Sequence, residues 1–462
     1  MTPVDVLPDD VLLVIFDFCV GGVRDQDNKR AIEAWQSLVH VCRRWRSIVF
    51  GSPRRLNLRL VCTPRTPARE SLDVWPALHL LIQGNISSTS VDDNIVVALG
   101  HSDRVCRINL ELTGGLQWDK VLAAMQVPFR ALTFMRLQCK DETAPVVSDT
   151  FLGGSAPGLQ HLVLSGIPFP GILKLLLSTT HLVYLYLHGI PHSGYFSPEA
   201  IVTCLSVLTS LDTLSLGFLS SRSRPDRESR RPPPITRSIL PDLTTIFFEG
   251  VSEYLDDLVA RIDAPRLESL FVTFLHQINI NTPHLAQFVS RTPRFEELIE
   301  AKINFDFDAP QVQFLSCTPD DYGEELCVEI LVRFSCGGSN QQLASMAQVC
   351  TMCLPWFPTV GNLRVSTNPY AESDWRDGVD NQWLELLRPF TAVKNLYLSE
   401  EFQPGIASAL QELVGCRTTE ALPSLQNIFL SRFEPSGPFQ EAIGEFIAAR
   451  QLSDHPIAVL PL

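Results

Sequence analysis

Apolar residues close to the N-terminus recur with helical spacing. Val11, Leu12, Ile15, Phe16 and Cys19 share one face of a predicted helix. The helix follows Leu7-Pro8-Asp9-Asp10, where proline suits the first helical turn and the aspartates complement the helix dipole. Gly21-Gly22 is expected to end it.

A second helix is predicted between the polar stretch Arg24–Arg30 and Gly51-Ser52-Pro53. Alternating apolar residues then predict a short strand around Leu56–Leu60. Two short helices bury little surface by themselves, so the segment needs a neighbouring domain or a partner protein. The apolar face of the second helix consists of Trp35, Leu38, Val39, Cys42, Trp45, Ile48 and Val49.

The long remainder of the chain repeats an apolar–x–x–apolar–x–apolar pattern. The middle positions are separated by between 23 residues (Leu162 to Leu185) and 33 residues (Ile330 to Leu363). A period of roughly 20–50 residues predicts an array of strand-containing repeats. The matches are Val105-Ile108-Leu110, Leu132-Met135-Leu137, Leu159-Leu162-Leu164, Leu182-Leu185-Leu187, Leu211-Leu214-Leu216, Leu243-Ile246-Phe248, Leu267-Leu270-Val272, Phe295-Leu298, Cys327-Ile330-Val332, Val360-Leu363-Val365, Val393-Leu396-Leu398 and Leu425-Ile428-Leu430.

Stretches with helical periodicity lie between these predicted strands. A strand followed by a helix, repeated, forms a parallel sheet with helices on its other side, and the curvature of the array makes the sheet side concave. Residues 61–104 fit the repeat least well, with a possible strand near Leu78–Ile82 and a helix near Val91–Leu99. The clearest helices are Ser197–Leu208, Ser252–Ile262, Leu343–Cys353, Ile406–Val414 and Phe439–Arg450.

Length and charge narrow the class of protein. With 462 residues, the chain exceeds the roughly 250–300 residues that one core supports, so it is a multidomain protein or a repeat array. Residues 1–60 carry nine Arg or Lys and seven Asp or Glu, a net +2, so the rest carries −16 of the total −14. An acidic bulk repels phosphate, which argues against nucleic acid and membrane surfaces as general partners.

No export signal is visible at the N-terminus, and no apolar run is long enough for a membrane span. The twelve cysteines have no framework spacing and are interpreted as reduced, mostly buried residues. Asn85-Ile86-Ser87 is then a chance match to a glycosylation sequon. A cytoplasmic or nuclear location is expected.

The N-terminal residues resemble the F-box. Leu7-Pro8, Asp10 and Ile15-Phe16 are followed, after an insertion, by Val41-Cys42-Arg43-x-Trp45. The family is an α-helical module that docks on the Skp-type adaptor of cullin–RING ubiquitin ligases. Asp10 stands where glutamate is commoner, and Val20–Ala34 is longer than in a compact F-box. An alternative role is a helical cap that closes the repeat array.

The repeats resemble the irregular leucine-rich repeats that follow an F-box in large fungal F-box families. The resemblance implies an α/β fold: an N-terminal α-helical F-box (1–55), a joint or first irregular repeat (56–104) and an irregular leucine-rich-repeat solenoid (105–462). The low-complexity composition of residues 219–238 predicts a disordered loop there. The usual Asn or Cys at the ninth repeat position is absent except at Asn368, so no polar ladder is expected. The apolar ninth positions are Ile167, Ile190, Leu219, Val251 and Leu275.

The function that these resemblances imply is that of a substrate-receptor subunit of an SCF-type ubiquitin ligase. The repeats hold an unidentified target protein, and the chain is neither an enzyme nor dependent on a cofactor. The alternative is a leucine-rich-repeat interaction scaffold that is not coupled to a ligase. The residues implied in adaptor binding are Leu7, Pro8, Val11, Leu12, Ile15, Phe16, Leu38, Val41 and Trp45.

The fifth position of each repeat should face the concave surface. Five of these ten residues are aromatic, against 9% in the whole chain, which is the composition of a binding surface unless loops cover it. The proposed target-binding residues are Tyr186, Phe247, Phe271, Arg364, Tyr397 and Phe429. The other fifth positions are Val163, Ser215, Ile299 and Leu331, and seventh positions add His188, Glu249 and Arg333.

Other motifs carry less information. The basic, proline-rich stretch Ser220–Arg237 is a candidate for phosphorylation at Ser221, Ser223 or Ser229, for contact with an acidic partner, or for a merely solvated loop. Cys350-x-x-Cys353 lacks a second tight pair, which disfavours a zinc site with Cys327 and Cys336. No hydrolase, metalloprotease, P-loop or dinucleotide-binding motif is present.

Overall fold

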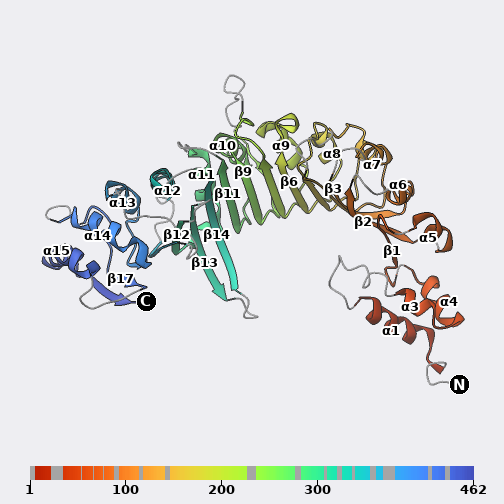
Figure 1. The fold of residues 1–462 in the computed structure, drawn as a ribbon, viewed down its shortest axis with the longest axis horizontal. Coiled ribbons are helices and arrows are strands. Elements are labelled where there is room, and N and C mark those ends of the chain that lie inside the picture. The colour runs from red at the N-terminus through yellow and green to blue at the C-terminus, as the bar shows by residue number, and fades with distance from the viewer. Residues whose placement is uncertain are drawn as a thin grey trace. The chain divides into compact units, whose positions relative to one another are not determined.

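The structure is a computed structural model (Figure 1). It divides the chain into two compact units, Met1–Tyr195 and Phe196–Leu462. Each unit is described by itself. The described residues are 6–21, 35–53, 55–65, 67–75, 78–87, 93–113, 118–140, 146–225, 236–275, 282–305, 310–319, 325–335, 339–353, 360–367, 380–414, 419–431 and 438–462.

The first unit starts with helices and continues as a parallel sheet. Its strands pair in chain order from β1 to β6. The strands are β1 (Arg59–Cys62), β2 (His79–Ser87), β3 (Val105–Thr113), β4 (Phe134–Cys139), β5 (His161–Ser165) and β6 (Tyr184–Ile190). The helices are α1 (Asp9–Gly21), α3 (Trp35–Val39), α4 (Arg43–Gly51), α5 (Ala68–Val74), α6 (Asp93–Leu99), α7 (Trp118–Ala124) and α8 (Ile172–Leu176), with 3-10 turns at Phe151–Gly154 and His192–Gly194.

The predicted second N-terminal helix is two helices rather than one. Residues 40 and 41 form a turn between α3 and α4, and Cys42 has an extended backbone. The Cys42 sulfur accepts a hydrogen bond from the Trp45 backbone N–H at 3.5 Å and so caps α4. The apolar spacing continues across this break, which is why periodicity alone predicted a single helix.

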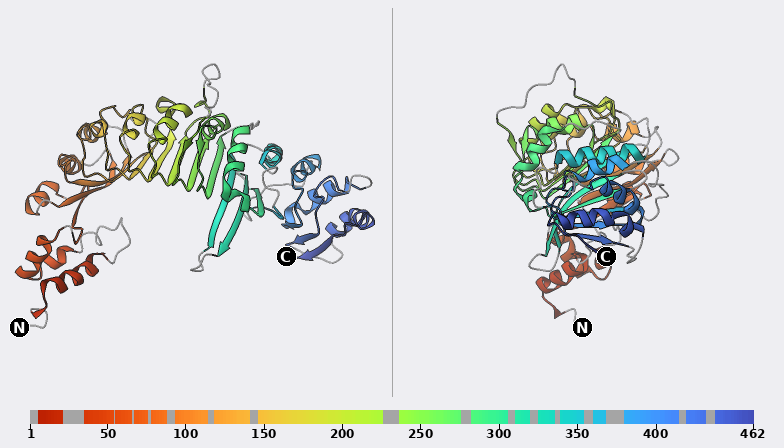
Figure 2. Two further views of the ribbon diagram at one scale, coloured as in Figure 1. Left: turned by 180° about the vertical axis from the view of Figure 1, so that it is seen from behind. Right: turned by 90° about the vertical axis from the view of Figure 1, so that its left-hand side faces the viewer.

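The apolar positions of the repeated pattern are buried in the first unit. Every strand from β3 to β6 places its middle and last pattern residues under the helices, and Leu132, Leu159 and Leu182 fill the core just before their strands. Backbone hydrogen bonds extend the pairing ahead of the strands, as from the Val183 N–H to the Gln160 carbonyl at 2.8 Å. Within this unit α6, α7 and α8 lie on one face of the sheet (Figures 1 and 2).

The second unit also combines a sheet with helices on one face, and the expected helices are present. Its helices are α9 (Pro198–Leu205), α10 (Ser252–Val259), α11 (Pro283–Arg291), α12 (Ser339–Cys353), α13 (Asp380–Leu387), α14 (Gln403–Gln411) and α15 (Pro438–Leu452), with 3-10 turns at Pro293–Glu297 and Glu400–Phe402. Its strands are β7 (Thr213–Phe218), β8 (Ser238–Ile239), β9 (Thr245–Gly250), β10 (Ile262–Asp263), β11 (Ser269–Leu275), β12 (Glu300–Phe305), β13 (Gln311–Pro319), β14 (Glu325–Ser335), β15 (Asn362–Thr367), β16 (Asn395–Leu398), β17 (Asn427–Leu430) and β18 (Ala458–Pro461).

The sheet of the second unit departs from the predicted all-parallel order. The strands follow the order β7-β9-β11-β14-β13-β12-β15-β16-β17-β18, and β13 is antiparallel to both β12 and β14. Residues 306–310 and 320–324 are too few for the crossover that a parallel connection needs, so β12, β13 and β14 form consecutive hairpins. The pattern at Cys327-Ile330-Val332 does mark a strand that pairs in parallel with β11, but β13 was not predicted.

The ends of the predicted disordered loop at 219–238 are ordered. Ser238 belongs to β8, which pairs with β10, and Arg237 forms an ion pair with Asp263 at 3.9 Å. Arg224 lies 3.9 Å from Glu253, and Ser223 is buried. Residues 226–235, which include the candidate phosphorylation site Ser229, lie outside the described residues.

Candidate functional site

Helix α1 carries apolar side chains on two sides. Leu12, Leu13 and Phe16 are buried. On the other side Val11, Val14, Ile15 and Phe18 form a stripe at i, i+3, i+4 and i+7, with exposed fractions of 42%, 50%, 41% and 81%. We call these four residues the α1 stripe.

The buried side of α1 packs into the core of an N-terminal helical module formed by α1, α3 and α4. The Phe16 and Trp45 rings lie 4.8 Å apart, and Leu38, Val39, Ile48 and Val49 complete the cluster. Trp35 is fully buried, and its ring centroid lies 5.1 Å from that of Trp75. Its indole N–H donates a hydrogen bond to the Arg59 carbonyl at 2.8 Å. These contacts join the module to the first strand of the sheet.

Arg44 fixes the start of α1. Its guanidinium donates to an Asp9 carboxylate oxygen at 2.6 Å and to the Leu7 carbonyl, which connects α4 to the N-terminal turn of α1. The Pro8 carbonyl accepts hydrogen bonds from the Val11 and Leu12 N–H groups, both at 3.1 Å. The Leu-Pro-Asp-Asp segment therefore sets the direction of α1 on the module.

The residues predicted to bind an adaptor fall into two groups in the structure. Leu12, Phe16 and Leu38 are core residues, so they position the helices and cannot be contact residues while the module stays folded. Pro8, Val11, Ile15 and Val41 are exposed, and Leu7 and Trp45 are partly buried.

Sequence reasoning missed Val14 and Phe18, which belong to the exposed group, as does Val6. The signal was available, because from Val11 to Val20 every residue except Asp17 is apolar. A single amphipathic face cannot accommodate such a run.

The first unit presents a row of planar side chains on the sheet face opposite its helices, which we call the first open face. Arg107, Phe134, His161 and Tyr184 occupy one register position on β3, β4, β5 and β6. The Arg107 guanidinium lies 3.8 Å from the Phe134 ring centroid, and the next ring pairs are 5.8 Å and 6.1 Å apart. Tyr186 and His188 lie next to this row, with ring centroids 5.3 Å apart.

The charges on the first open face come mainly from arginine. Arg136 follows Phe134 by two residues on β4, so its side chain lies on the same face of the sheet. Its guanidinium donates a hydrogen bond to the Gln138 side-chain oxygen at 3.1 Å. Glu111 is the only carboxylate in strands β2–β6, and Lys140 forms an ion pair with it. Burial lowers the pKa of His161, and the nearby positive charge of Arg107 lowers it further. His161 is therefore a neutral hydrogen-bonding group at pH 7.

The corresponding face of the second unit, the second open face, also carries aromatic side chains. The Phe247 and Phe271 rings stack at 4.5 Å across β9 and β11, and the Tyr397 and Phe429 rings stack at 4.7 Å across β16 and β17. The Arg364 guanidinium lies 4.8 Å from the Tyr397 centroid and 3.5 Å from a Glu300 carboxylate oxygen. The same carboxylate also faces Lys302, whose Nζ lies 4.0 Å from the other Glu300 oxygen, so Arg364 and Lys302 share one negative charge.

An asparagine ladder accompanies the second of these stacks. The Asn427 amide donates to the Asn395 side-chain oxygen, and the Asn395 amide donates to that of Asn362, both at 2.8 Å. Sequence reasoning expected no polar ladder, because it looked at the ninth repeat position. The ladder occupies the third position, and Asn368, the one residue that matched the family pattern, lies outside the described residues.

All six predicted target-binding residues lie on an open face. Tyr186 belongs to the first unit, and Phe247, Phe271, Arg364, Tyr397 and Phe429 belong to the second. The expectation for Ile299 was wrong, because β12 starts one residue later and Lys302 takes the register position beside Arg364. Leu331 pairs with Phe271 as expected but is buried.

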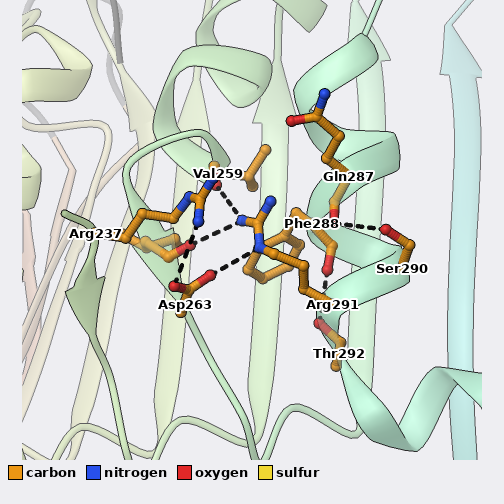
Figure 3. Close-up of polar contacts among 9 residues, drawn as sticks. Arg237, Val259, Asp263, Gln287, Phe288, Ser290, Arg291 and Thr292 are labelled. Carbon is orange, nitrogen blue, oxygen red and sulfur yellow. Dashed lines mark hydrogen bonds and ion pairs between the residues drawn. The ribbon is translucent and has the colours of Figure 1, made fainter. Parts of the chain in front are cut away.

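A polar cluster on the helix side of the second unit holds the end of the predicted loop (Figure 3). Asp263 lies between two arginines, with Arg291 at 2.9 Å and Arg237 at 3.9 Å. Arg291 also approaches the Val259 and Ile262 carbonyls at 3.5 Å and 3.4 Å. These contacts join α11 to the β8–β10 ribbon, so the cluster is structural.

Among the cysteines of the described residues, one pair departs from the expected reduced state. Cys317 and Cys327 form a disulfide between directly paired residues of β13 and β14. Cys327 is therefore not a thiolate ligand, and Cys350 is buried in α12. Among the described residues no group of three or more His, Cys, Asp or Glu side chains is arranged to hold a metal ion. Nor does any helix in the described ranges have the length and apolar character to cross a membrane.

Comparison of the chain with protein-family models and with curated protein sequences gives no match.

Proposed function

We propose that this chain is the substrate receptor of a cullin–RING ubiquitin ligase. In this proposal the N-terminal helical module is an F-box that docks on a Skp-type adaptor, and the open faces of a leucine-rich repeat array bind the target. The receptor performs no chemistry itself. It raises the effective concentration of target lysines near the ubiquitin carrier.

The α1 stripe is the observation that carries this proposal. A helix that is apolar on both sides is normally buried on both sides, yet α1 uses only one side for its own module. Fully burying a side chain such as Val, Ile or Phe stabilises a structure by about 1.5–3 kcal/mol, so the exposed stripe offers a large gain to a partner with an apolar surface.

The sequence motif supports the same assignment. Of the residues that the F-box resemblance implies in adaptor binding, Pro8, Val11, Ile15 and Val41 are exposed. Arg44, inside the Val-Cys-Arg-x-Trp segment, orients the first turn of α1 through Asp9. The motif therefore combines residues that build the module with residues that remain available to a partner.

Co-purification tests the proposal. The full chain is co-expressed with a tagged Skp-type adaptor, alongside Val11→Glu/Ile15→Glu and a control, Val127→Glu, which alters a valine of similar exposure elsewhere in the first unit. We expect the unaltered chain and the control to be captured. The double variant should lose at least ~100-fold in affinity, because two carboxylates would be buried without partners.

Failure of the unaltered chain to bind the adaptor would overturn the proposal, as would capture of the double variant. If the chain instead self-associates through the α1 stripe, as judged by light scattering, the alternative of an interaction scaffold not coupled to a ligase is favoured.

A further inference from the structure

The first open face combines arginine with the edges of aromatic rings. Phe134, His161 and Tyr184 lie side by side across the sheet, and their interplanar angles of 33° and 27° show that the rings face one another rather than meeting edge to face. Because strand side chains stand roughly perpendicular to the sheet, the outer edges of such a row are the parts open to a ligand. Ring edges carry the positive part of the aromatic quadrupole, so they attract negatively charged and carbonyl oxygens.

Arg107 and Arg136 add formal positive charge beside these edges. Together with the hydroxyl groups of Tyr184 and Tyr186 they supply donors to an anionic ligand. The one carboxylate of strands β2–β6, Glu111, is paired with Lys140. This face is therefore positive in a chain of net charge −14.

We propose that the first open face binds an acidic peptide segment, rich in Asp or Glu, of a partner protein. Its carboxylates would contact Arg107 and Arg136, and its backbone carbonyls would lie along the ring edges toward Tyr184 and Tyr186. In biological terms this inference rests on the proposed function, since the acidic segment would belong to the ubiquitination target.

The dimensions suit an extended peptide. Arg107 and Tyr184 are three strand spacings apart, about 14 Å at ~4.8 Å per spacing. An extended segment of about four residues crosses that distance at ~3.3 Å per residue. The segment runs across the strands, so side-chain contacts rather than strand pairing determine its specificity.

An acidic peptide fits this face better than a nucleic acid. Nucleic-acid binding depends on neutralising many phosphates, whereas this face offers two arginines and the rest of the chain is acidic. A short peptide with two or three carboxylates matches the number of cations. Binding should weaken as the salt concentration rises, because the charges are partly exposed.

Fluorescence anisotropy with the purified full chain tests the proposal without an adaptor. The probe is a short fluorescein-labelled peptide of alternating Glu and Ala, and its charge control replaces every Glu by Gln. We expect the Glu peptide to bind at least ~10-fold more tightly than the Gln peptide. Arg107→Gln/Arg136→Gln should remove that difference, and Arg107→Lys/Arg136→Lys should restore most of it.

Arg364→Gln is the matched control, because this arginine also packs on a tyrosine ring of an open face but belongs to the second unit. This variant should bind the Glu peptide with an affinity within about twofold of that of the unaltered chain. Thermal unfolding of each variant establishes that the sheet is intact.

Equal binding of the Glu and Gln peptides would overturn the proposal. So would unchanged binding by a folded Arg107→Gln/Arg136→Gln variant, or tighter binding of a labelled single-stranded oligonucleotide or a phosphoserine peptide to the same residues. None of these results depends on whether the α1 stripe binds an adaptor, so the two proposals can fail separately.

Discussion

Helices α1 and α10 use their apolar residues in opposite ways. In α10, Tyr254, Leu255, Leu258 and Val259 are all buried under the sheet of the second unit. In α1, three apolar residues are buried and the four of the α1 stripe are exposed. Helix α10 buries its apolar residues in the core of its own unit. Helix α1 buries one apolar side in its module and keeps a second apolar side exposed. The proposed function assigns this remaining apolar surface of α1 to a partner.

The two open faces show a related contrast. Both carry stacked aromatic side chains, but on the second face Glu300 lies beside Arg364 and Lys302, whereas strands β2–β6 of the first unit carry two arginines and a single carboxylate, Glu111, which pairs with Lys140. Stacked planar side chains therefore occur on both open faces, and the two faces differ in the number and pairing of their charged side chains.

The largest predicted effect separates the two sides of α1. Phe16→Ala should reduce the free energy of unfolding of the N-terminal module by about 3–5 kcal/mol, because it removes a fully buried ring that packs on Trp45. Phe18→Ala should change it by no more than about 0.5 kcal/mol. Urea unfolding followed by tryptophan fluorescence is suitable, since three of the seven tryptophans, Trp35, Trp45 and Trp75, lie in or against the core of the module. If both variants lost the same free energy of unfolding, Phe18 would have to be packed as closely as Phe16, and the α1 stripe would not be an exposed surface.

A second prediction concerns the hairpin that interrupts the parallel order of the second unit. Among the described residues, 316–319 and 325–328 pair only with each other, so no described strand flanks the end of the β13–β14 hairpin. Cys317→Ser should lower stability under oxidising conditions by about 2–3 kcal/mol, as expected for a short closed loop. Thermal unfolding with and without a dithiol reductant measures this, and a variant with unchanged stability in both conditions would contradict it.

A third prediction concerns the asparagine ladder, which accompanies the stack on the second open face. Asn395→Ala removes two side-chain hydrogen bonds and should cost about 1–2 kcal/mol, whereas Asn427→Ala removes one and should cost about half as much. Chemical denaturation of the two variants gives the comparison. Equal, negligible costs would indicate that the ladder does not stabilise the sheet.

The smallest predicted effect is a pH dependence specific to the first open face. The pKa of His161 in the folded chain is lower than its ordinary value of 6.5. The unfolded chain therefore binds the proton more readily, and stability is lost as the pH falls below about 6.5 toward the folded pKa. His161→Gln should weaken that pH dependence in thermal unfolding between pH 7 and pH 5. An unchanged profile would remove His161 as its source.

Much of the fold followed from periodicity. The positions of Leu162, Leu185 and Ile246 in the core were predictable, because strands of one array place the same pattern positions under the helices. Strand β13 was not, since Gln311–Pro319 lies outside the repeat and its pairing depends on the short connections at each end. A periodic pattern reports which residues are buried and says little about strand order.

The candidate site was predictable in kind rather than in detail. Phe16 and Phe18 are both apolar and two positions apart, so the sequence alone does not tell which of them the module buries. The packing of Trp45 on Phe16 decides it. Likewise the row from Arg107 to Tyr184 depends on the register of four strands, which brings together residues that are up to 77 positions apart (184 − 107).

The exposed α1 stripe as a docking surface is the central claim, and hydrogen–deuterium exchange of the full chain with and without an excess of a Skp-type adaptor tests it most directly. We predict slower exchange of backbone amides in α1 and in the turn at residues 40–42 when the adaptor is present, with no change in α10. Unchanged exchange in α1, or protection confined to the open faces, would contradict the claim.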